Sequence, residues 1–262
     1  MLLSLRVTGG NKMNIIVNNK TIKLDVKETT DSYIEKYHQL NAQLEDGHKT
    51  AIGIYKKDLS EEVYTPEYSE RRYTDVTRGL AIAFEQGARK LNEEYKSFVI
   101  GAKETLSAVF SIPDKSNDYA VKFANALRLL ELEGAGITDK GAYDIIGEFI
   151  GDMETMKRFE RVIVLLKGEN EVFDIYGHTK FPLTFKKLEC CREFLDAFDE
   201  LEAIAENFFL NRKKEIRHEV LATGKQLTIP QDGMQQLMDE YNSKKLADKL
   251  NGIIRELFIT TD

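Results

Sequence analysis

Hydrophobic residues recur at helical spacing along most of the chain. Between Thr74 and Ser111, one stripe contains Val76, Leu80, Phe84, Ala88, Leu91, Tyr95, Phe98 and Ala102. Spacings of three and four residues place such side chains on one face of a helix that packs against a core. Comparable stripes predict helices at about 33–46, 74–111, 117–133, 139–166, 183–222, 231–241 and 243–258. The sequence therefore predicts a mainly α fold, a multi-helix bundle with one long helix.

Local signals set the expected helix boundaries. Ser32 and Glu35 form a capping box, which predicts the start of the first helix, and Gly47 predicts its end. Thr138 is expected to cap the helix at 139–166. The segment 50–65 is open between a short strand at 51–55 and a turn or short helix at 58–64.

A small β-hairpin is predicted near the N-terminus, over residues 14–26. Polar and apolar residues alternate from Thr21 to Val26, and Asn18-Asn19 tolerates the positive φ of a tight turn. A hairpin of this size is not stable alone, so we expect its apolar face to lie on a helix.

The first twelve residues differ in character from the rest of the chain. Thr8–Met13 can be encoded by codons that carry a bacterial ribosome-binding sequence just before the codon of Met13. We therefore expect residues 1–12 to be a translated leader that is poorly ordered and dispensable. The alternative is that Gly9-Gly10 is simply a turn.

The segment 183–222 carries the strongest helical pattern. A single helix of about 40 residues would be about 60 Å long, more than the diameter of a compact domain of this size. It must therefore kink, or project and pair, so a homo-oligomer through this helix is possible. The segment Thr223–Pro230 is the candidate linker, and Pro230 suits a first helical turn. The predicted organisation is a leader at 1–12, a helical bundle at 13–222 and a C-terminal helical pair at 223–262.

Composition excludes several classes of protein. Acidic residues outnumber basic ones by 44 to 37, which gives a formal charge of −7 and argues against a nucleic-acid binder. No apolar run reaches the roughly 20 residues that span a bilayer. Cys190 and Cys191 are adjacent and cannot easily pair, which fits a reducing compartment. Together with the bacterial ribosome-binding sequence expected before Met13, these features predict a protein of the bacterial cytoplasm with no membrane association.

Candidate catalytic chemistry is weak. Three Glu-x-x-His pairs occur: Glu35/His38, Glu45/His48 and Glu215/His218. Two such pairs are part of a di-iron carboxylate site, but that fold needs a helical glutamate before the first pair. We interpret the pairs as surface polar contacts. No catalytic residue, cofactor site or metal site is predicted, and the chain is expected not to be an enzyme. A helical enzyme with an unrecognised carboxylate or metal site remains the alternative class.

Two surface groups are candidates for binding a partner protein. The first is Tyr68, Arg71, Arg72 and Tyr73, because tyrosine and arginine are enriched at interfaces. The same residues could instead cap a helix start. The second is the basic group Arg212, Lys213, Lys214 and Arg217. Its alternative role is to complement the dipole at the end of the long helix.

The segment 14–44 and two short later stretches resemble a known family. The strand-like Ile16–Asp25, the helix that opens Tyr33-Ile34-Glu35-Lys36-Tyr37, and Ile175-Tyr176-Gly177 with Leu188–Phe194 resemble small helical tail-assembly chaperones of phages from Gram-positive hosts. The resemblance covers about a quarter of the chain and carries no catalytic residue. It implies a bacteriophage or prophage protein that binds a phage or host protein during assembly or chaperoning. The alternative is a phage inhibitor that sterically blocks a host defence or metabolic enzyme.

Overall fold

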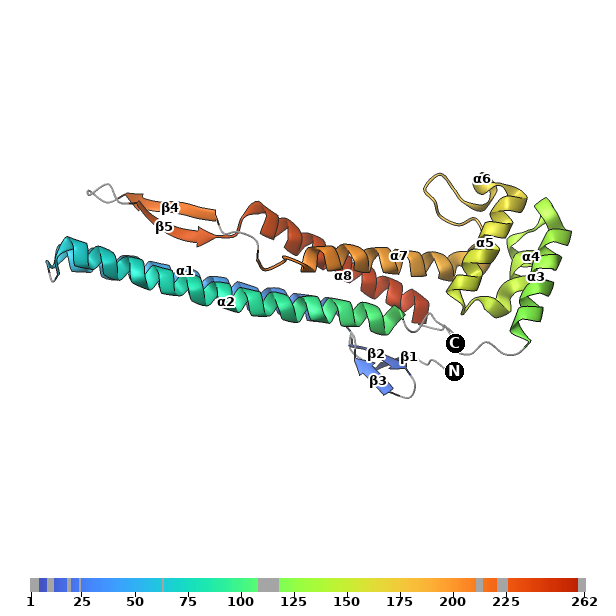
Figure 1. Cartoon of the computed structure of the whole chain (residues 1–262), viewed down its shortest axis with the longest axis horizontal. Helices are drawn as coiled ribbons and strands as arrows, with labels where there is room; N and C mark the ends of the chain where they lie inside the picture. The colour runs from blue at the N-terminus through green and yellow to red at the C-terminus, as the bar shows by residue number, and fades with distance from the viewer. Residues whose placement is uncertain are drawn as a thin grey trace. The chain divides into compact units, whose positions relative to one another are not determined.

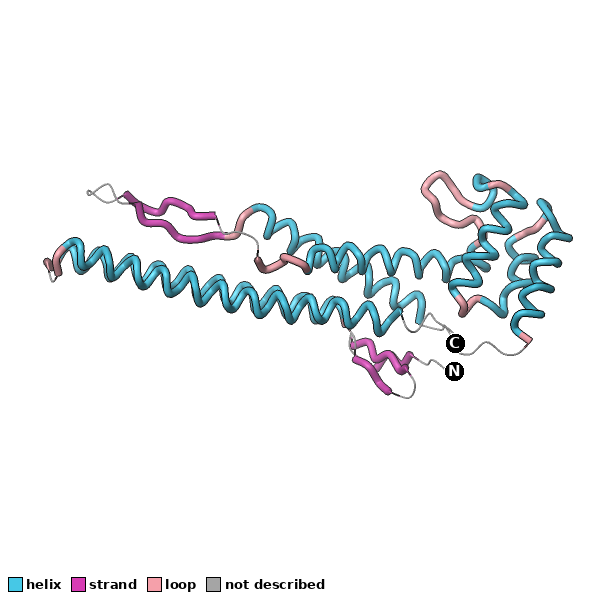
Figure 2. Tube along the Cα trace, viewed as in Figure 1, coloured by secondary structure: helices cyan, strands magenta, loops and turns pink. Residues whose placement is uncertain are grey.

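The structure is a computed structural model that describes residues 5–8, 12–17, 20–23, 25–62, 64–107, 118–210, 214–220 and 226–258. Helices make up most of this part of the chain (Figures 1 and 2), so the predicted mainly α class is confirmed. Two compact units are present. Unit 1 comprises 1–24, 101–199 and 249–262, and unit 2 comprises 25–100 and 200–248. No helix among the described residues is long and apolar enough to cross a membrane.

The helices and strands succeed one another along the chain as labelled in Figure 1. The α-helices are α1 (Val26–Ser60), α2 (Pro66–Ser107), α3 (Tyr119–Glu133), α4 (Asp139–Ile146), α5 (Met153–Lys167), α6 (Glu169–Val172), α7 (Pro182–Ala205) and α8 (Met234–Phe258). Short 3-10 helices occupy Gly134–Gly136 and Gly147–Phe149. The strands are β1 (Leu5–Thr8), β2 (Lys12–Val17), β3 (Lys20–Lys23), β4 (Lys214–Val220) and β5 (Gln226–Gln231).

The N-terminal strands form an antiparallel sheet in the order β1-β2-β3. Leu5 pairs with Ile15, and Val17 pairs with Lys20. The predicted turn Asn18-Asn19 lies outside the described residues, so the hairpin stays a prediction. Strand β1 falls within residues 1–12, which the sequence predicts to be poorly ordered.

Helix α1 begins earlier and ends later than its sequence predicts. Asp25 caps it by accepting a hydrogen bond from the Glu28 backbone N–H, so Ser32 does not begin the helix. The predicted stop at Gly47 is wrong, and the candidate strand at 51–55 is helical. A Cβ on Gly47 would lie 2.7 Å from Leu80 Cδ2. Gly47 therefore makes room for a neighbouring helix rather than ending its own.

The core of unit 2 is aromatic and is completed by residues far apart in sequence. Phe208 stacks on Phe209 with ring centroids 4.4 Å apart. Tyr95 of α2 lies 5.4 Å from Phe208, and Tyr37 of α1 lies 5.0 Å from Phe209. All four side chains are buried. The burial of these four aromatic rings is the main favourable contribution that holds α1 and α2 against the segment after α7.

The predicted long helix at 183–222 is wrong, because α7 ends at Ala205. Asn92 of α2 reaches this end: its amide donates to the backbone carbonyls of Ala205 and Glu206, and its oxygen accepts from the Phe209 N–H. A side chain from another helix thus satisfies the terminal backbone groups and turns the chain. The segment 183–222, predicted as one helix, therefore contains most of α7 and, after it, the strand β4.

The predicted linker at 223–230 is also wrong in its second half. Strand β5 runs antiparallel to β4, with Ile216 opposite Ile229. Leu227 and Ile229 are buried against Ile52 and Tyr55 of α1. Pro230, expected in a helix, lies in β5, where a two-stranded sheet has an edge that tolerates its missing N–H. The helical pair predicted after it is one continuous helix, α8.

The core of unit 1 is built from α3 to α7. Thr138 caps α4 by accepting from the Gly141 N–H, as predicted, and Gly134 ends α3 with φ +58°. The single helix predicted at 139–166 is divided, because a 3-10 turn comes after Ile146 and Asp152 caps a new helix, α5. The buried side chains of this core include Leu130, Ile137, Ile146, Phe149, Met156, Phe159, Ile163 and Phe185.

Candidate functional site

The first half of α8 has an apolar face that is exposed. Met234, Leu237, Met238 and Tyr241 are 73, 53, 53 and 67 % exposed. Their spacing of i, i+3, i+4 and i+7 puts them on one side of the helix. We call these four residues the α8 stripe. An exposed stripe of this kind is typical of a surface that binds another protein.

The opposite face of the same helix is polar and buried. Gln236 is 1 % exposed, and its amide atoms have no hydrogen-bond partner in the described part of the chain. Ser243, two turns on, is fully buried. A buried amide without a partner costs about 1–3 kcal/mol. The polarity of the first half of α8 is thus inverted, whereas the second half buries apolar residues such as Ala247, Leu250 and Ile254.

Polar contacts with α1 hold α8 in this orientation. The Asp232 carboxylate, just before α8, accepts from the Tyr37 hydroxyl at 2.8 Å and from the Asn41 amide at 2.7 Å. His38 Nε2 lies 2.8 Å from Glu240 Oε2. Burial is the main reason that the pKa of Tyr37 is raised, so its hydroxyl stays protonated and able to donate. These contacts direct the α8 stripe away from α1.

The predicted patch around Arg71 lies near the start of α2. Tyr68 is more than half exposed and its ring lies 4.9 Å from that of Tyr64. Arg71 is highly exposed and makes a long ion pair with Asp75 of its own helix. These side chains form an accessible aromatic and cationic surface.

The other two residues of this patch have structural contacts. Arg72 donates to Asp58 of α1 at 3.0 Å, and that carboxylate is largely buried. The Tyr73 ring packs 5.2 Å from that of Tyr55. Arg72 and Tyr73 therefore tie α1 to α2, which leaves Tyr68 and Arg71 as the accessible half of the patch.

The structure describes two of the four residues in the basic group after α7. Arg212 and Lys213 lie outside the described residues. Lys214 and Arg217 lie on β4, which pairs with β5. The interpretation that these cations complement the dipole of the long helix is wrong, because α7 ends earlier, at Ala205.

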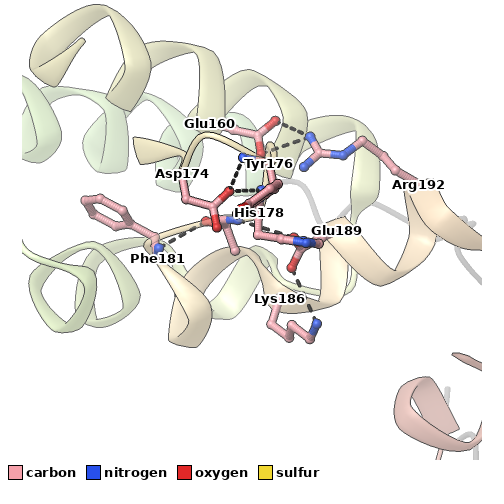
Figure 3. Close-up of polar contacts among 9 residues, drawn as sticks. Glu160, Asp174, Tyr176, His178, Phe181, Lys186, Glu189 and Arg192 are labelled. Atoms are coloured by element: carbon pink, nitrogen blue, oxygen red, sulfur yellow. Dashed lines mark hydrogen bonds and ion pairs between the residues drawn. The ribbon is translucent and has the colours of Figure 1, made fainter. Parts of the chain in front are cut away.

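A polar cluster in unit 1 joins the loop after α6 to α7 (Figure 3). His178 Nδ1 lies 3.0 Å from Glu189 Oε1, and Glu193 is one turn further along α7. Among the described residues, His178, Glu189 and Glu193 form the group whose possible metal-ligand atoms all lie within 4.8 Å of one another. Glu189 is 6 % exposed and also accepts from the Thr179 backbone N–H at 3.3 Å.

The loop that carries His178 is held by backbone hydrogen bonds. Asp174 Oδ1 accepts from the backbone N–H groups of Tyr176 and His178, both at 2.8 Å. Burial alone would raise the pKa of Asp174, but these two hydrogen bonds lower it. Gly177 turns the loop with φ +82°, and Phe173 bridges to Thr179. His178 is therefore placed by a well-bonded turn.

Next to this cluster, Arg192 of α7 contacts both carboxylate oxygens of Glu160 on α5, at 3.0 and 2.7 Å. Both residues are more buried than ordinary surface charges. This pair connects two helices of the unit 1 core. Glu160 therefore binds Arg192 and not His178.

The histidines and cysteines considered from the sequence have other surroundings in the structure than the sequence suggested. His38 pairs with Glu240 rather than with Glu35, and His48 is buried within α1 instead of lying beyond its end. Cys190 and Cys191 are both buried, and burial raises the pKa of Cys191 to about 12. The group at His178 was missed because its histidine comes from a loop, with no Glu-x-x-His spacing to mark it.

The α8 stripe was visible in the sequence as helical spacing, but its exposure was not. An apolar face is normally assigned to the core, and only the structure shows that Gln236 takes that place. Comparison of the chain with protein-family models, with curated proteins and with solved structures finds no match.

Proposed function

We propose that this chain is a non-enzymatic protein-binding protein and that the α8 stripe is its main binding surface. The observation that carries the proposal is the inverted polarity of the first half of α8, which exposes Met234, Leu237, Met238 and Tyr241 while it buries Gln236. Water penalises this arrangement, and a partner that covers the stripe removes the penalty.

The stripe fits an apolar groove of another protein. Helices that dock into grooves use anchors at i, i+3, i+4 and i+7, which is the spacing seen here. Two of the anchors are methionines, whose flexible side chains adapt to irregular surfaces. Four partly exposed side chains offer less than the roughly 800 Å² per partner of a standard interface. An apolar groove that receives the exposed side of α8 therefore suits the stripe better than flat pairing with a second copy.

Tyr68 and Arg71 offer a second contact for the same partner or another one. Both are exposed, and their residue types are common in the energetic centres of interfaces. The role that the sequence resemblance supports is phage assembly or chaperoning. A partner from the virion agrees with that role, whereas a host enzyme as partner supports the inhibitor.

Site-specific photo-cross-linking tests the surface. A photoreactive phenylalanine at Tyr241 should form an adduct with one partner protein, identified by mass spectrometry, in the native bacterial cell. The matched control is the same probe at Tyr143, an exposed tyrosine of unit 1. Equal adducts at both positions, or an adduct with a second copy of the chain, would contradict the proposal.

A charge substitution gives an independent measurement. The double variant Leu237→Glu/Met238→Glu should lose at least about tenfold in affinity for the identified partner, because charges in a buried interface are costly. Leu165→Glu, at an exposed leucine of α5, should bind like the unmodified chain. If both variants bind equally well, the α8 stripe is not the binding surface.

A further inference from the structure

We propose that His178, Glu189 and Glu193 bind one zinc ion. The three side chains lie in unit 1 and take no part in the α8 stripe. The inference is therefore independent of the proposed function, and neither depends on the other's test.

The geometry is close to that of a zinc site. Zinc binds histidine nitrogen and carboxylate oxygen at about 2.0–2.2 Å, which places neighbouring ligands of a tetrahedron about 3.3 Å apart. His178 Nδ1 and Glu189 Oε1 are 3.0 Å apart, and all three ligand atoms lie within 4.8 Å. Glu193 is partly exposed and one helical turn from Glu189, so rotation of its side chain can close the remaining gap.

The charges around the site favour a cation. Two carboxylates face one imidazole, and Glu189 is almost fully buried. Lys186 Nζ lies 3.5 Å from the second oxygen of Glu189 and is itself half exposed. Bringing Glu193 toward Glu189 places two negative charges together, which a divalent ion compensates far better than a solvated lysine.

The donor set selects the kind of metal. An imidazole nitrogen with two carboxylates suits zinc and similar transition metals, whereas calcium and magnesium require more oxygen ligands. Cys191 is on the same helix, but it is two positions from both Glu189 and Glu193 and therefore lies on a different side of α7. Since the His178 side chain is 63 % exposed, water can reach a fourth position.

The loop supports this role for His178. Asp174 accepts hydrogen bonds from the backbone N–H groups of Tyr176 and His178, which hold the backbone that carries the ring (Figure 3). The ring already presents Nδ1 to Glu189. Coordination through Nδ1 leaves the proton on Nε2.

Zinc titration of the tag-free full chain, stripped of metal with a chelator, tests the site. Competition with a chromophoric zinc chelator should show one ion bound per chain with micromolar or tighter affinity. Cobalt should give the visible absorption bands of a four-coordinate site. His178→Ala and Glu193→Gln should each weaken zinc binding by at least about tenfold.

The matched control is His38→Ala, since His38 also lies 2.8 Å from a glutamate but belongs to no such three-ligand group among the described residues. This variant should bind zinc like the unmodified chain. Unchanged circular dichroism of Glu193→Gln separates loss of a ligand from loss of fold. The absence of stoichiometric binding, equal binding by His178→Ala, loss of binding in His38→Ala or a preference for calcium would each overturn the proposal.

Discussion

Leu80 of α2 lies directly over Gly47 of α1, where a Cβ would come within 2.8 Å of both Leu80 methyl carbons. The reciprocal contact occurs seven residues away along each helix: Leu40 of α1 lies over Gly87 of α2, 3.1 Å from the place of its Cβ. The two contacts repeat at a heptad interval along an antiparallel pair of helices. Each glycine accepts a leucine of the opposite helix, so the helices approach closely.

Substitution of two glycines in α1 by alanine should therefore have different effects on stability. Beyond the adjoining backbone of α1, no atom of the described residues lies within 4 Å of a Cβ at Gly53, so Gly53→Ala should raise the free energy of unfolding by about 0.5–1 kcal/mol. Gly47→Ala should not raise the free energy of unfolding, because the added Cβ would lie 2.7 Å from Leu80 Cδ2. Gly47→Leu should lower it by about 2 kcal/mol because Leu80 is displaced. Urea denaturation measures both. Equal stabilisation by alanine at the two positions would show that the close approach at Gly47 is absent.

Asn92 should be a large single contributor to the stability of unit 2. Asn92→Ala removes the hydrogen bonds to Ala205, Glu206 and Phe209 and leaves buried backbone groups unsatisfied. We expect a loss of about 2–4 kcal/mol in urea denaturation. The exposed neighbour Glu93 is the control, and Glu93→Ala should change stability by less than about 0.5 kcal/mol.

The buried amide of Gln236 provides a test of the inverted helix. Gln236→Met keeps the shape of the side chain and removes the polar atoms that lack a described partner. We expect stability to rise by about 1 kcal/mol. Gln235→Met, at the exposed position beside it, should leave the thermal midpoint nearly unchanged. A lower midpoint for Gln236→Met would indicate that the amide is hydrogen-bonded after all.

The thiols should be protected in the native protein. Burial raises the pKa of Cys191 to about 12, and Cys190 is buried as well. A thiol reagent at pH 8 should therefore label neither cysteine until the chain is denatured. Because the folded pKa of Cys191 lies above the unfolded value, its contribution to stability is complete below about pH 8.5 and is lost as the pH rises toward 12. Rapid labelling of the native chain at pH 8 would contradict this.

The helical class could be predicted from the sequence because its signals are local. The stripe that includes Leu80 and Tyr95 shows the helical period directly, and Thr138 and Gly134 act on their own helix ends. These features need no knowledge of distant residues.

The errors arise where a distant residue decides the outcome. Gly47 looks like a helix stop unless Leu80 is known to lie over it. Ala205 ends α7 because Asn92, more than a hundred positions earlier, binds its carbonyl. The metal-site candidate likewise depends on a loop that brings His178 to Glu189. Tertiary contacts of this kind override local propensity and leave no periodic signal.

The division of unit 2 into 25–100 and 200–248 has a consequence for synthesis of the chain. A ribosome makes α1 and α2 first, with Tyr37 and Tyr95, and then completes α3 to α7 before Phe208 and Phe209 emerge. During that interval the aromatic surface of the newly made hairpin has no cover from Phe208 and Phe209. Exposed apolar surface of this kind makes a nascent chain prone to association, so fast translation of the remaining segment, or a factor that covers the α1–α2 pair, should reduce it.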